Sequence, residues 1–253
     1  MTSIIRRLII TSLLSVWVAA AATPVLAEEI TVAVAANFTE PAKEIAAAFE
    51  KATGDKVTLS FGASGQFYTQ IASGAPFEVF LSADADRPTK AEQAGLAVAG
   101  TRFTYAVGRL VLWSPTAGLV DDHGVVLKSG GFSKLSIADP AAAPYGLAAI
   151  QTLKTLGLYD QVKPKIVQGS SIAQAFEFVK TGNAELGFVA LSQVIAEPSG
   201  SRWLVPEGDH EPITQQAVLL KPGADSAGAR SFLTFLKGGQ AKAIIHRFGY
   251  ATS

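Results

Sequence analysis

Four short stretches of the chain place polar or small residues where a strand is expected to end and a helix to begin. They are centred on Asn37 (AANF), Ser64 (GASG), Tyr145 (APYG) and Ile172 (SSIA), and none of them contains Lys or Arg. At such turns the free N–H groups of a helix N-terminus carry a partial positive charge that favours an anion. The Asn37 amide and the hydroxyls of Ser64 and Tyr145 would add neutral donors, and Ile172 would add its backbone amide. This combination is typical of a site for a small, fully ionised oxyanion.

Each of these residues also has an ordinary structural interpretation. Ser64 could be a plain helix N-cap, a position where serine is common. Asn37 could cap the following helix, with Glu40 completing a capping box. Tyr145 could be a half-buried packing residue, and the side chain of Ile172 is expected to face the core. Taken singly, none of the four residues decides between binding and structure.

An exported hydrolase with Ser64 as nucleophile is the alternative from another class. GASGQ does not match the nucleophile elbow G-x-S-x-G, because Gln66 stands in place of the second glycine. A serine nucleophile also needs an oriented base. The histidines, His123, His210 and His246, fall in polar loops or on the tail helix, without a serine or metal-ligand pattern beside them. The chain is therefore not expected to be an enzyme, and neither a cofactor nor a metal cation bound by side chains is expected.

The composition limits the possible partners and chemistry. Hydrophobic residues make up 49% of the 253 residues and charged residues 17%, which is typical of a globular protein with a sizeable core. Lys plus Arg, at 21, balances Asp plus Glu, at 21, so no basic surplus is present to bind nucleic acid. Cysteine is absent, which excludes disulfides, thiolate nucleophiles and iron–sulfur clusters.

The N-terminus has the pattern of a cleaved signal peptide. Arg6 and Arg7 precede an apolar run over residues 8–22, and Val25-Leu26-Ala27 resembles a cleavage site. A membrane anchor is the alternative, but the run is marginal in length for spanning a bilayer. We therefore expect residues 1–27 to be removed and the mature protein to be periplasmic.

After residue 28, short apolar runs alternate with segments of helical periodicity. In residues 39–54, for example, Ile45, Ala48 and Phe49 share one helical face, and Gly54 supplies a stop. Further helices are expected over 65–74, 147–156 (with Leu147, Ile150 and Leu153 on one stripe) and 171–180. Such alternation predicts an α/β fold with mostly parallel sheets flanked by helices.

Two longer strand-like segments, 101–115 and 212–223, interrupt this alternation and are expected to cross between two lobes. The tail, 229–250, reads as an amphipathic helical run that packs back on the first lobe. The expected division is lobe 1 over residues 28–104 and 217–253, and lobe 2 over residues 105–216.

The chain resembles the periplasmic molybdate-binding proteins of ABC transporters, which have a type II periplasmic-binding fold. The resemblance covers almost the whole chain after the leader. It is carried, in this order, by ITVAVAANF, VTLSFGASGQFYTQI, GAPFEVFLSAD, LSIADPAAAPYG, LGFVALS and FLKGGQAKAIIHRFGY. As an ordered set these stretches are far more specific than any one of them.

The resemblance implies a ligand set without positively charged side chains. The implied residues are Asn37, Ser64, Tyr145 and the backbone of Ile172. One branch of the family has a tyrosine after the next strand, where this chain has Ala190, so the chain resembles the branch with Asn and Tyr. That branch can also have threonine before the asparagine; Ala36 stands here, and one hydroxyl contact is lost.

The resemblance also implies the function: high-affinity binding of molybdate, and also tungstate, by a monomer that delivers it to an inner-membrane ABC permease. A receptor for sulfate or another tetrahedral oxyanion is the alternative in the same class. Molybdate, tungstate and sulfate are dianions at neutral pH, so donors alone can bind them. Phosphate keeps a proton at this pH and needs an acceptor. The nearest acidic residue, Asp139, precedes Pro140 and is expected to be a turn residue.

Overall fold

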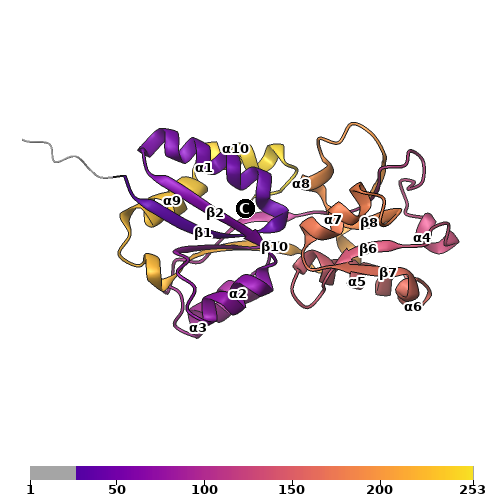
Figure 1. Cartoon of the computed structure of the whole chain (residues 1–253), viewed down its shortest axis with the longest axis horizontal. Helices are drawn as coiled ribbons and strands as arrows, with labels where there is room; N and C mark the ends of the chain where they lie inside the picture. The colour runs from indigo at the N-terminus through magenta and orange to yellow at the C-terminus, as the bar shows by residue number, and fades with distance from the viewer. Residues whose placement is uncertain (1–26, 253) are drawn as a thin grey trace, which may run out of the picture.

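The computed structural model describes residues 27–252 and shows two lobes, each built on a five-stranded sheet (Figure 1). The strand orders are β2-β1-β3-β10-β4 and β7-β6-β8-β5-β9. The two-lobed α/β fold expected from the sequence is confirmed. The expected signal peptide lies outside the described residues, apart from Ala27.

The first lobe has a mixed sheet. Its strands are β1 (Glu29–Ala35), β2 (Lys56–Gly62), β3 (Val79–Ser82), β4 (Phe103–Gly108) and β10 (Ile213–Leu219). Strand β1 lies between β2 and β3 and is parallel to both, while β10 is antiparallel to β3 and β4. Its helices are η1 (Ala36–Phe38), α1 (Thr39–Thr53), α2 (Ser64–Ala72), α3 (Asp86–Gln93), η4 (Lys221–Gly223), α9 (Ala227–Lys237) and α10 (Gly239–Arg247).

Helices cover both faces of this sheet. Helices α1, α9 and α10 lie on one side and α2 and α3 on the other (Figure 1). The apolar stripe of α1 supplies Ile45 and Phe49, both fully buried, and the Phe49 ring packs edge-on against Phe232 of α9 at 5.3 Å. Burial of each such side chain contributes about 1.5–3 kcal/mol. Helix α1 ends at Gly54, whose φ of 87° is left-handed and suits glycine.

The second lobe repeats this layering. Its strands are β5 (Leu110–Ser114), β6 (Leu135–Ala138), β7 (Ile166–Gly169), β8 (Leu186–Ala190) and β9 (Ser201–Leu204). Its helices are α4 (Val126–Ser129), α5 (Pro144–Thr155), α6 (Tyr159–Val162), η2 (Lys163–Lys165), α7 (Ile172–Lys180), α8 (Leu191–Val194) and η3 (Glu207–Asp209). Strand β6 is parallel to β7 and β8, and β5 is antiparallel to β8 and β9.

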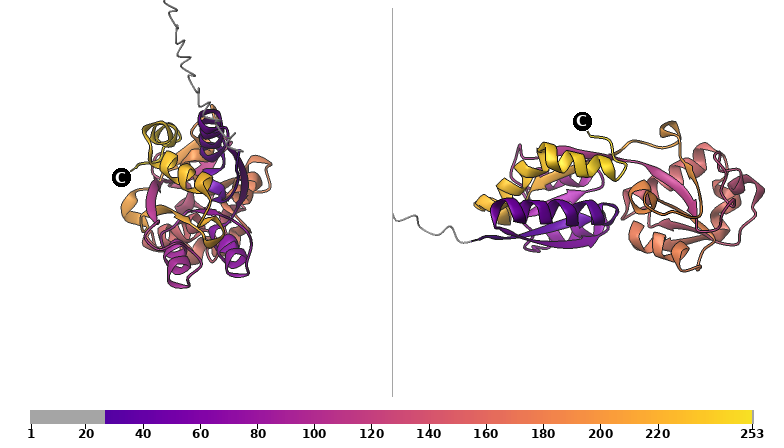
Figure 2. Two further views of the ribbon diagram at one scale, coloured as in Figure 1. Left: turned by 90° about the vertical axis from the view of Figure 1, so that its left-hand side faces the viewer. Right: turned by 90° about the horizontal axis from the view of Figure 1, so that it is seen from above.

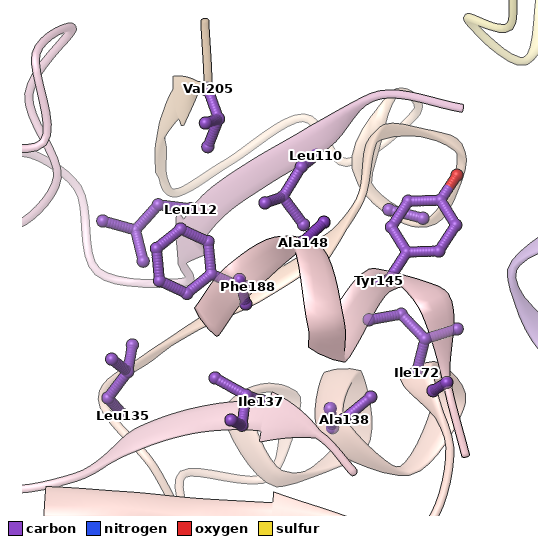
Figure 3. Close-up of a cluster of buried hydrophobic side chains, with 14 of the residues drawn as sticks. Leu110, Leu112, Leu135, Ile137, Ala138, Tyr145, Ala148, Ile172, Phe188 and Val205 are labelled. Carbon is purple, nitrogen blue, oxygen red and sulfur yellow. The ribbon is translucent and has the colours of Figure 1, made fainter. Parts of the chain in front are cut away.

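Every residue of β5 is buried, because both faces of the second sheet are covered. Leu110 and Leu112 pack under α5 together with Phe188 of β8 (Figure 3). The alternate residue Trp113 packs against Phe176 of α7, with ring centroids 5.4 Å apart. The first turn of α5 lies at the edge of this core, where it meets the other lobe.

The chain crosses between the sheets at Arg109, which separates β4 from β5, and returns over residues 205–212, between β9 and β10. The expected lobe boundaries, after 104 and after 216, fall inside β4 and β10, so each change of sheet lies about four residues from the expected position. The segment 101–115 is thus two strands in two sheets. Helices α9 and α10 pack back on the first lobe, beside α1 (Figure 2). Among residues 27–252, no helix has both the length and the apolar character needed to cross a membrane.

Candidate anion-binding site

The four candidate residues line one small cavity between the lobes. Asn37 and Ser64 come from the first lobe and Tyr145 and Ile172 from the second. All four are buried, with exposed fractions of 1–3%. The space open to the centre of a water molecule is about 10 Å³, roughly the room that one water needs. The lobes are therefore closed over this point. The rest of the lining consists of Ala35, Ala36, Gly62, Ala63, Ala83, Ala143 and Pro144.

The sheet topology explains why residues so distant in sequence meet here. The turns follow the carboxyl ends of the parallel strands β1, β2, β6 and β7. Ligand sites in open α/β sheets lie beyond those ends. Helices α2, α5 and α7 begin at Ser64, Pro144 and Ile172, so three helix N-termini border the cavity. Their first N–H groups have no partner within their own helices.

Ser64 does not cap its helix. The N-cap of α2 is Ala63, which makes no side-chain hydrogen bond, so the capping interpretation of Ser64 is wrong. Instead Ser64 Oγ accepts a hydrogen bond from the backbone N–H of Ala83 at 2.9 Å. That bond fixes the oxygen and leaves the hydroxyl hydrogen free for a ligand.

Asn37 contributes differently from the expectation. Its Nδ2 donates to Gln215 Oε1 at 2.8 Å and to the Tyr250 hydroxyl at 3.0 Å, which uses both amide hydrogens. The side-chain amide therefore has no hydrogen left for a ligand, and only backbone N–H groups of this turn can serve as donors there. The expected capping box is also wrong, because α1 has Phe38 at its N-cap without a side-chain hydrogen bond, and Glu40 pairs with Lys43.

Tyr145 combines a packed ring with a buried hydroxyl. Its ring lies against the core of the second lobe, while its hydroxyl points away from the labelled apolar side chains (Figure 3). The hydroxyl oxygen accepts a hydrogen bond from Gln215 Nε2 at 3.2 Å. Burial, and then the nearby hydroxyls of Tyr250 and Tyr105, raise the pKa of Tyr145 well above its ordinary value. Tyr145 is therefore a neutral donor.

Ile172 has the arrangement expected of a backbone donor. Its side chain packs in the core of the second lobe, near Tyr145 (Figure 3). It is the first residue of α7, and Ser171 caps that helix by accepting from the Gln174 N–H at 3.3 Å. Ala190, where another branch of the family has tyrosine, is fully buried.

The histidines lie away from Ser64. His210 Nδ1 lies 2.7 Å from the Glu211 carbonyl and His246 Nδ1 lies 3.2 Å from the Tyr250 carbonyl. His123 donates its backbone N–H to Asp121. Within the described part of the chain no histidine bonds to Ser64, so the serine lacks the base that would activate it.

A buried polar network behind the cavity was not predicted. Gln215 Oε1 accepts from the Tyr105 hydroxyl at 3.0 Å as well as from Asn37. The Tyr250 hydroxyl lies 2.7 Å from the Asn37 carbonyl and 2.8 Å from Ser192 Oγ. Ser192 Oγ also donates to the Asn37 carbonyl at 2.8 Å, which joins the lobes. Burial raises the pKa of Tyr250 to about 12.

The signal for Gln215 was present in the sequence. In the strand ITQQAVL it alternates with Ile213 and Ala217, both buried, so period-two geometry points Gln215 inward. A buried amide on a crossing strand is unusual and indicates a polar network.

A second, larger cavity of about 530 Å³ adjoins the first at the mouth of the cleft. Its charged lining residues are Asp84, Asp86, Arg87, Lys90 and Glu211. Leu147 also lies here, 46% exposed, so it is not part of the buried stripe predicted for α5.

Two backbone carbonyls of the second lobe bond to the first lobe at this mouth. Arg87, paired with Asp84, donates from Nη2 to the Ala141 carbonyl at 2.8 Å. The Gly65 N–H donates to the next carbonyl, that of Ala142, at 2.9 Å. These bonds fasten the loop that leads into Tyr145.

Asp139 is a turn residue, as expected. Its Oδ1 accepts from the Ala141 N–H at 3.0 Å, and it is not among the residues that line the small cavity. No carboxylate stands among the described residues of that lining, so the cavity provides donors without a charged acceptor.

Two lobes closed over a buried, uncharged set of donors define a solute-binding protein for a small anion. Residues 30–251 match the family model described as bacterial extracellular solute-binding protein. The molybdate-binding protein ModA of Rhodobacter capsulatus is 58% identical over 231 residues, 91% of each chain. ModA of Azotobacter vinelandii is 57% identical over 227 residues, 88% of this chain and 90% of that protein.

The structural comparison agrees with these relatives. The periplasmic molybdate-binding protein of Azotobacter vinelandii superimposes with a TM-score of 0.86 and 44% identity, covering 88% of this chain and 99% of that one. The chain belongs to the family of bacterial extracellular solute-binding proteins that includes these molybdate-binding proteins.

Proposed function

We propose that the protein captures molybdate, and also tungstate, in the periplasm and delivers it to an ABC permease of the inner membrane. In this proposal residues 1–27 direct export and are removed, and the mature protein acts as a monomeric binder without catalysis or a cofactor. The observation that carries the proposal is the convergence of four strand-to-helix turns on one closed, uncharged cavity. Relatives at 57–58% identity bear the name molybdate-binding protein, which supports the ligand.

The proposed ligand set is Ser64 Oγ, the Tyr145 hydroxyl, and the backbone N–H groups of the Asn37 and Ile172 turns. Hydrogen bonds to a charged group contribute about 1.5–3 kcal/mol each, so several of them suffice for tight binding without a positive side chain. Helix N-termini add partial positive charge. The lining has no carboxylate to accept a proton, which disfavours phosphate relative to a fully ionised dianion.

Closure and binding are coupled in this arrangement. Ser64 and the Asn37 turn lie on the first lobe, while Tyr145 and Ile172 lie on the second. An anion that bonds to both pairs favours the closed state by its additional contacts there. The buried anion is then hidden from water until a partner opens the lobes.

Calorimetry and thermal unfolding test the ligand. The mature protein should bind molybdate and tungstate tightly, sulfate weakly and phosphate hardly at all. At a molybdate concentration of about a hundred times Kd, ligand binding should add roughly 2.7 kcal/mol to the unfolding free energy. Sulfate at the same concentration should add much less. If sulfate stabilises the protein as well as molybdate does, the alternative of a sulfate receptor replaces this proposal.

A further inference from the structure

Gln215 occupies the centre of the polar network behind the cavity. Its side chain is fully buried. Oε1 accepts from Asn37 Nδ2 at 2.8 Å and from the Tyr105 hydroxyl at 3.0 Å, and Nε2 donates to the Tyr145 hydroxyl at 3.2 Å. The bond to Tyr145 joins the first lobe to the second. Gln215 therefore contacts one candidate ligand residue from each lobe without lining the cavity itself.

The local backbone is built to aim this side chain. Gln215 pairs with Ala106 and Gln216 with Thr104, so Tyr105 is an extra residue on β4. Such bulges redirect side chains and are frequent beside functional sites. The neighbouring Gln216 belongs to a separate set of contacts, because its amide bonds to Arg102 and Thr104.

The direction of the Gln215–Tyr145 bond determines what Tyr145 can do. Because Gln215 Nε2 donates to the Tyr145 oxygen, the hydroxyl hydrogen of Tyr145 must point elsewhere. The Tyr250 hydroxyl is its other neighbour, and a side-chain hydrogen bond between the two hydroxyls raises the pKa of Tyr145. A dianion in the cavity is a much stronger acceptor than another hydroxyl. The hydrogen of Tyr145 is thus available to the ligand as long as Gln215 holds the oxygen.

Gly108 keeps the space for this contact. A Cβ atom at Gly108 would lie 2.1 Å from the Tyr145 hydroxyl oxygen and 2.7 Å from Gln215 Nε2. The φ of Gly108 is not in the left-handed region, so alanine can adopt the same backbone. A methyl group there would displace the Tyr145 hydroxyl without removing any hydrogen-bonding group.

We propose that Gln215 is a positioning residue of the anion site, which directs the Tyr145 hydroxyl at the bound dianion and holds the Asn37 side chain. This inference rests on the proposed function, because it assigns a role within the same site. Gln215 acts through Tyr145 and Asn37 and does not touch the ligand.

A double-mutant cycle tests the coupling, with molybdate and tungstate as the probes. Gln215→Met keeps the length of the side chain but removes its hydrogen bonds, and we expect binding to weaken by about tenfold. Tyr145→Phe should weaken it by a similar factor. The double variant should bind about as well as Gln215→Met alone, because the Tyr145 hydroxyl is no longer aimed. The control, Gln216→Met on the same strand, should bind like the wild type.

Gly108→Ala is the second variant, and it carries the test if Gln215→Met does not fold. We expect molybdate to dissociate at least about fivefold faster, with little change in the association rate. The melting temperature without ligand should fall, because the methyl group crowds the buried Tyr145 and Gln215 side chains. An unchanged rate of dissociation in Gly108→Ala overturns the proposal. So does a Gln215→Met variant that binds molybdate within about twofold of the wild type. The proposal also fails if the losses of affinity in the two single variants multiply in the double variant. Wild-type protein that binds no oxyanion would instead refute the proposed function itself.

Discussion

The small cavity and the mouth of the cleft are adjacent but chemically opposite. The small cavity is lined by neutral residues, and its donors are almost completely buried. The mouth is far larger, about 530 Å³, and carries Asp84, Asp86, Arg87, Lys90 and Glu211. The mouth has the volume and the charged residues commonly associated with a ligand site, yet the convergent donors lie in the small cavity. Charge is thus excluded from the place where the charged ligand is proposed to bind.

A physical reason for this separation is the cost of desolvation. A cation buried beside the cavity would be unpaired whenever the ligand is absent, which costs several kcal/mol. Neutral hydroxyl and amide donors cost less when unpaired, so the empty site remains tolerable and the ligand can leave. The charges at the mouth stay near water, where solvent and salt weaken their interactions. Their measurable role is expected in closure, through Arg87.

The largest effect on affinity should come from introducing a negative charge into the small cavity. Ala36→Asp places a carboxylate in the lining of the small cavity. Two like unit charges about 4 Å apart repel by about 4 kcal/mol at an effective dielectric constant of 20, so molybdate affinity should fall by about a thousandfold or more. Calorimetry measures this, with thermal unfolding to confirm a folded protein. The control Gln151→Glu adds the same charge at the mouth and should change affinity by less than about threefold at physiological salt.

Ser64→Ala removes a neutral donor from the cavity. We expect affinity to fall by at least about tenfold, since a hydrogen bond to a charged group contributes about 1.5–3 kcal/mol. Stability should fall only modestly, because the Ala83 N–H loses its acceptor. Binding and unfolding are measured on the same variant. Lowered stability with unchanged affinity would show that the Ser64 hydroxyl is structural.

Tyr145→Phe tests the donor from the second lobe. The ring and its packing stay, but the closed complex loses a charge-assisted hydrogen bond. Dissociation of molybdate should become about tenfold faster while association changes little, because first encounter with Ser64 and the Asn37 turn is unaffected. Stopped-flow binding separates the two rates. An equal rate of dissociation would leave Ile172 and its neighbouring amides as the closing contacts.

The positions of these turns could be predicted from the sequence, because each lies where the alternating pattern of a strand changes to the spacing of a helix. Alternation in β1 and β2 gives way to helical spacing at Asn37 and Ser64, and parallel topology then requires the junctions to meet. Side-chain partners could not be read in this way. Ser64 bonds to Ala83, nineteen residues away, and not to its own helix, because β2 and β3 flank β1 in parallel and so end at the same edge of the sheet.

The lobe boundaries and the hidden network show a similar limit. The crossing strands continue about four residues beyond the expected boundaries, because strand pairing in the first sheet extends to Gly108 and begins again at Ile213. Gln215 and Tyr250 meet Asn37 across 178 and 213 residues of chain. Local sequence patterns do not predict long-range pairs of this kind. The one local signal was the alternation in β10, which points the Gln215 side chain inward.

Arg87→Met should produce a small effect at the mouth. It removes the donor to the Ala141 carbonyl and so weakens a contact between the lobes. We expect affinity to fall by about three- to fivefold, since a net hydrogen bond is worth about 0.5–1.5 kcal/mol. Lys90→Met is the matched control: it removes the same charge from the same cavity, but Lys90 pairs with Asp86 on its own helix and not with the second lobe. If both variants weaken binding equally, the mouth acts through its net charge and not through closure.

The smallest expected effect is that of pH on affinity. Burial raises the pKa of Tyr145 and Tyr105 well above the ordinary value and that of Tyr250 to about 12, so all three stay neutral donors at ordinary pH. Molybdate affinity should therefore change by less than about twofold between about pH 6.5 and about pH 9. A steeper change would reveal an ionisable group in the cavity.

On the alkaline side, the tyrosines should affect stability only above this pH range. The folded pKa of Tyr250 lies above its ordinary value of 10.0, so burial of the neutral hydroxyl stabilises the fold fully below pH 10. That contribution is lost as the pH rises from 10 towards about 12, because the unfolded chain releases its proton first. Urea unfolding across this range measures the loss, and Tyr250→Phe should reduce its slope. If molybdate affinity stays constant while stability declines at alkaline pH, ionisation in the network affects folding and not binding in the neutral cavity.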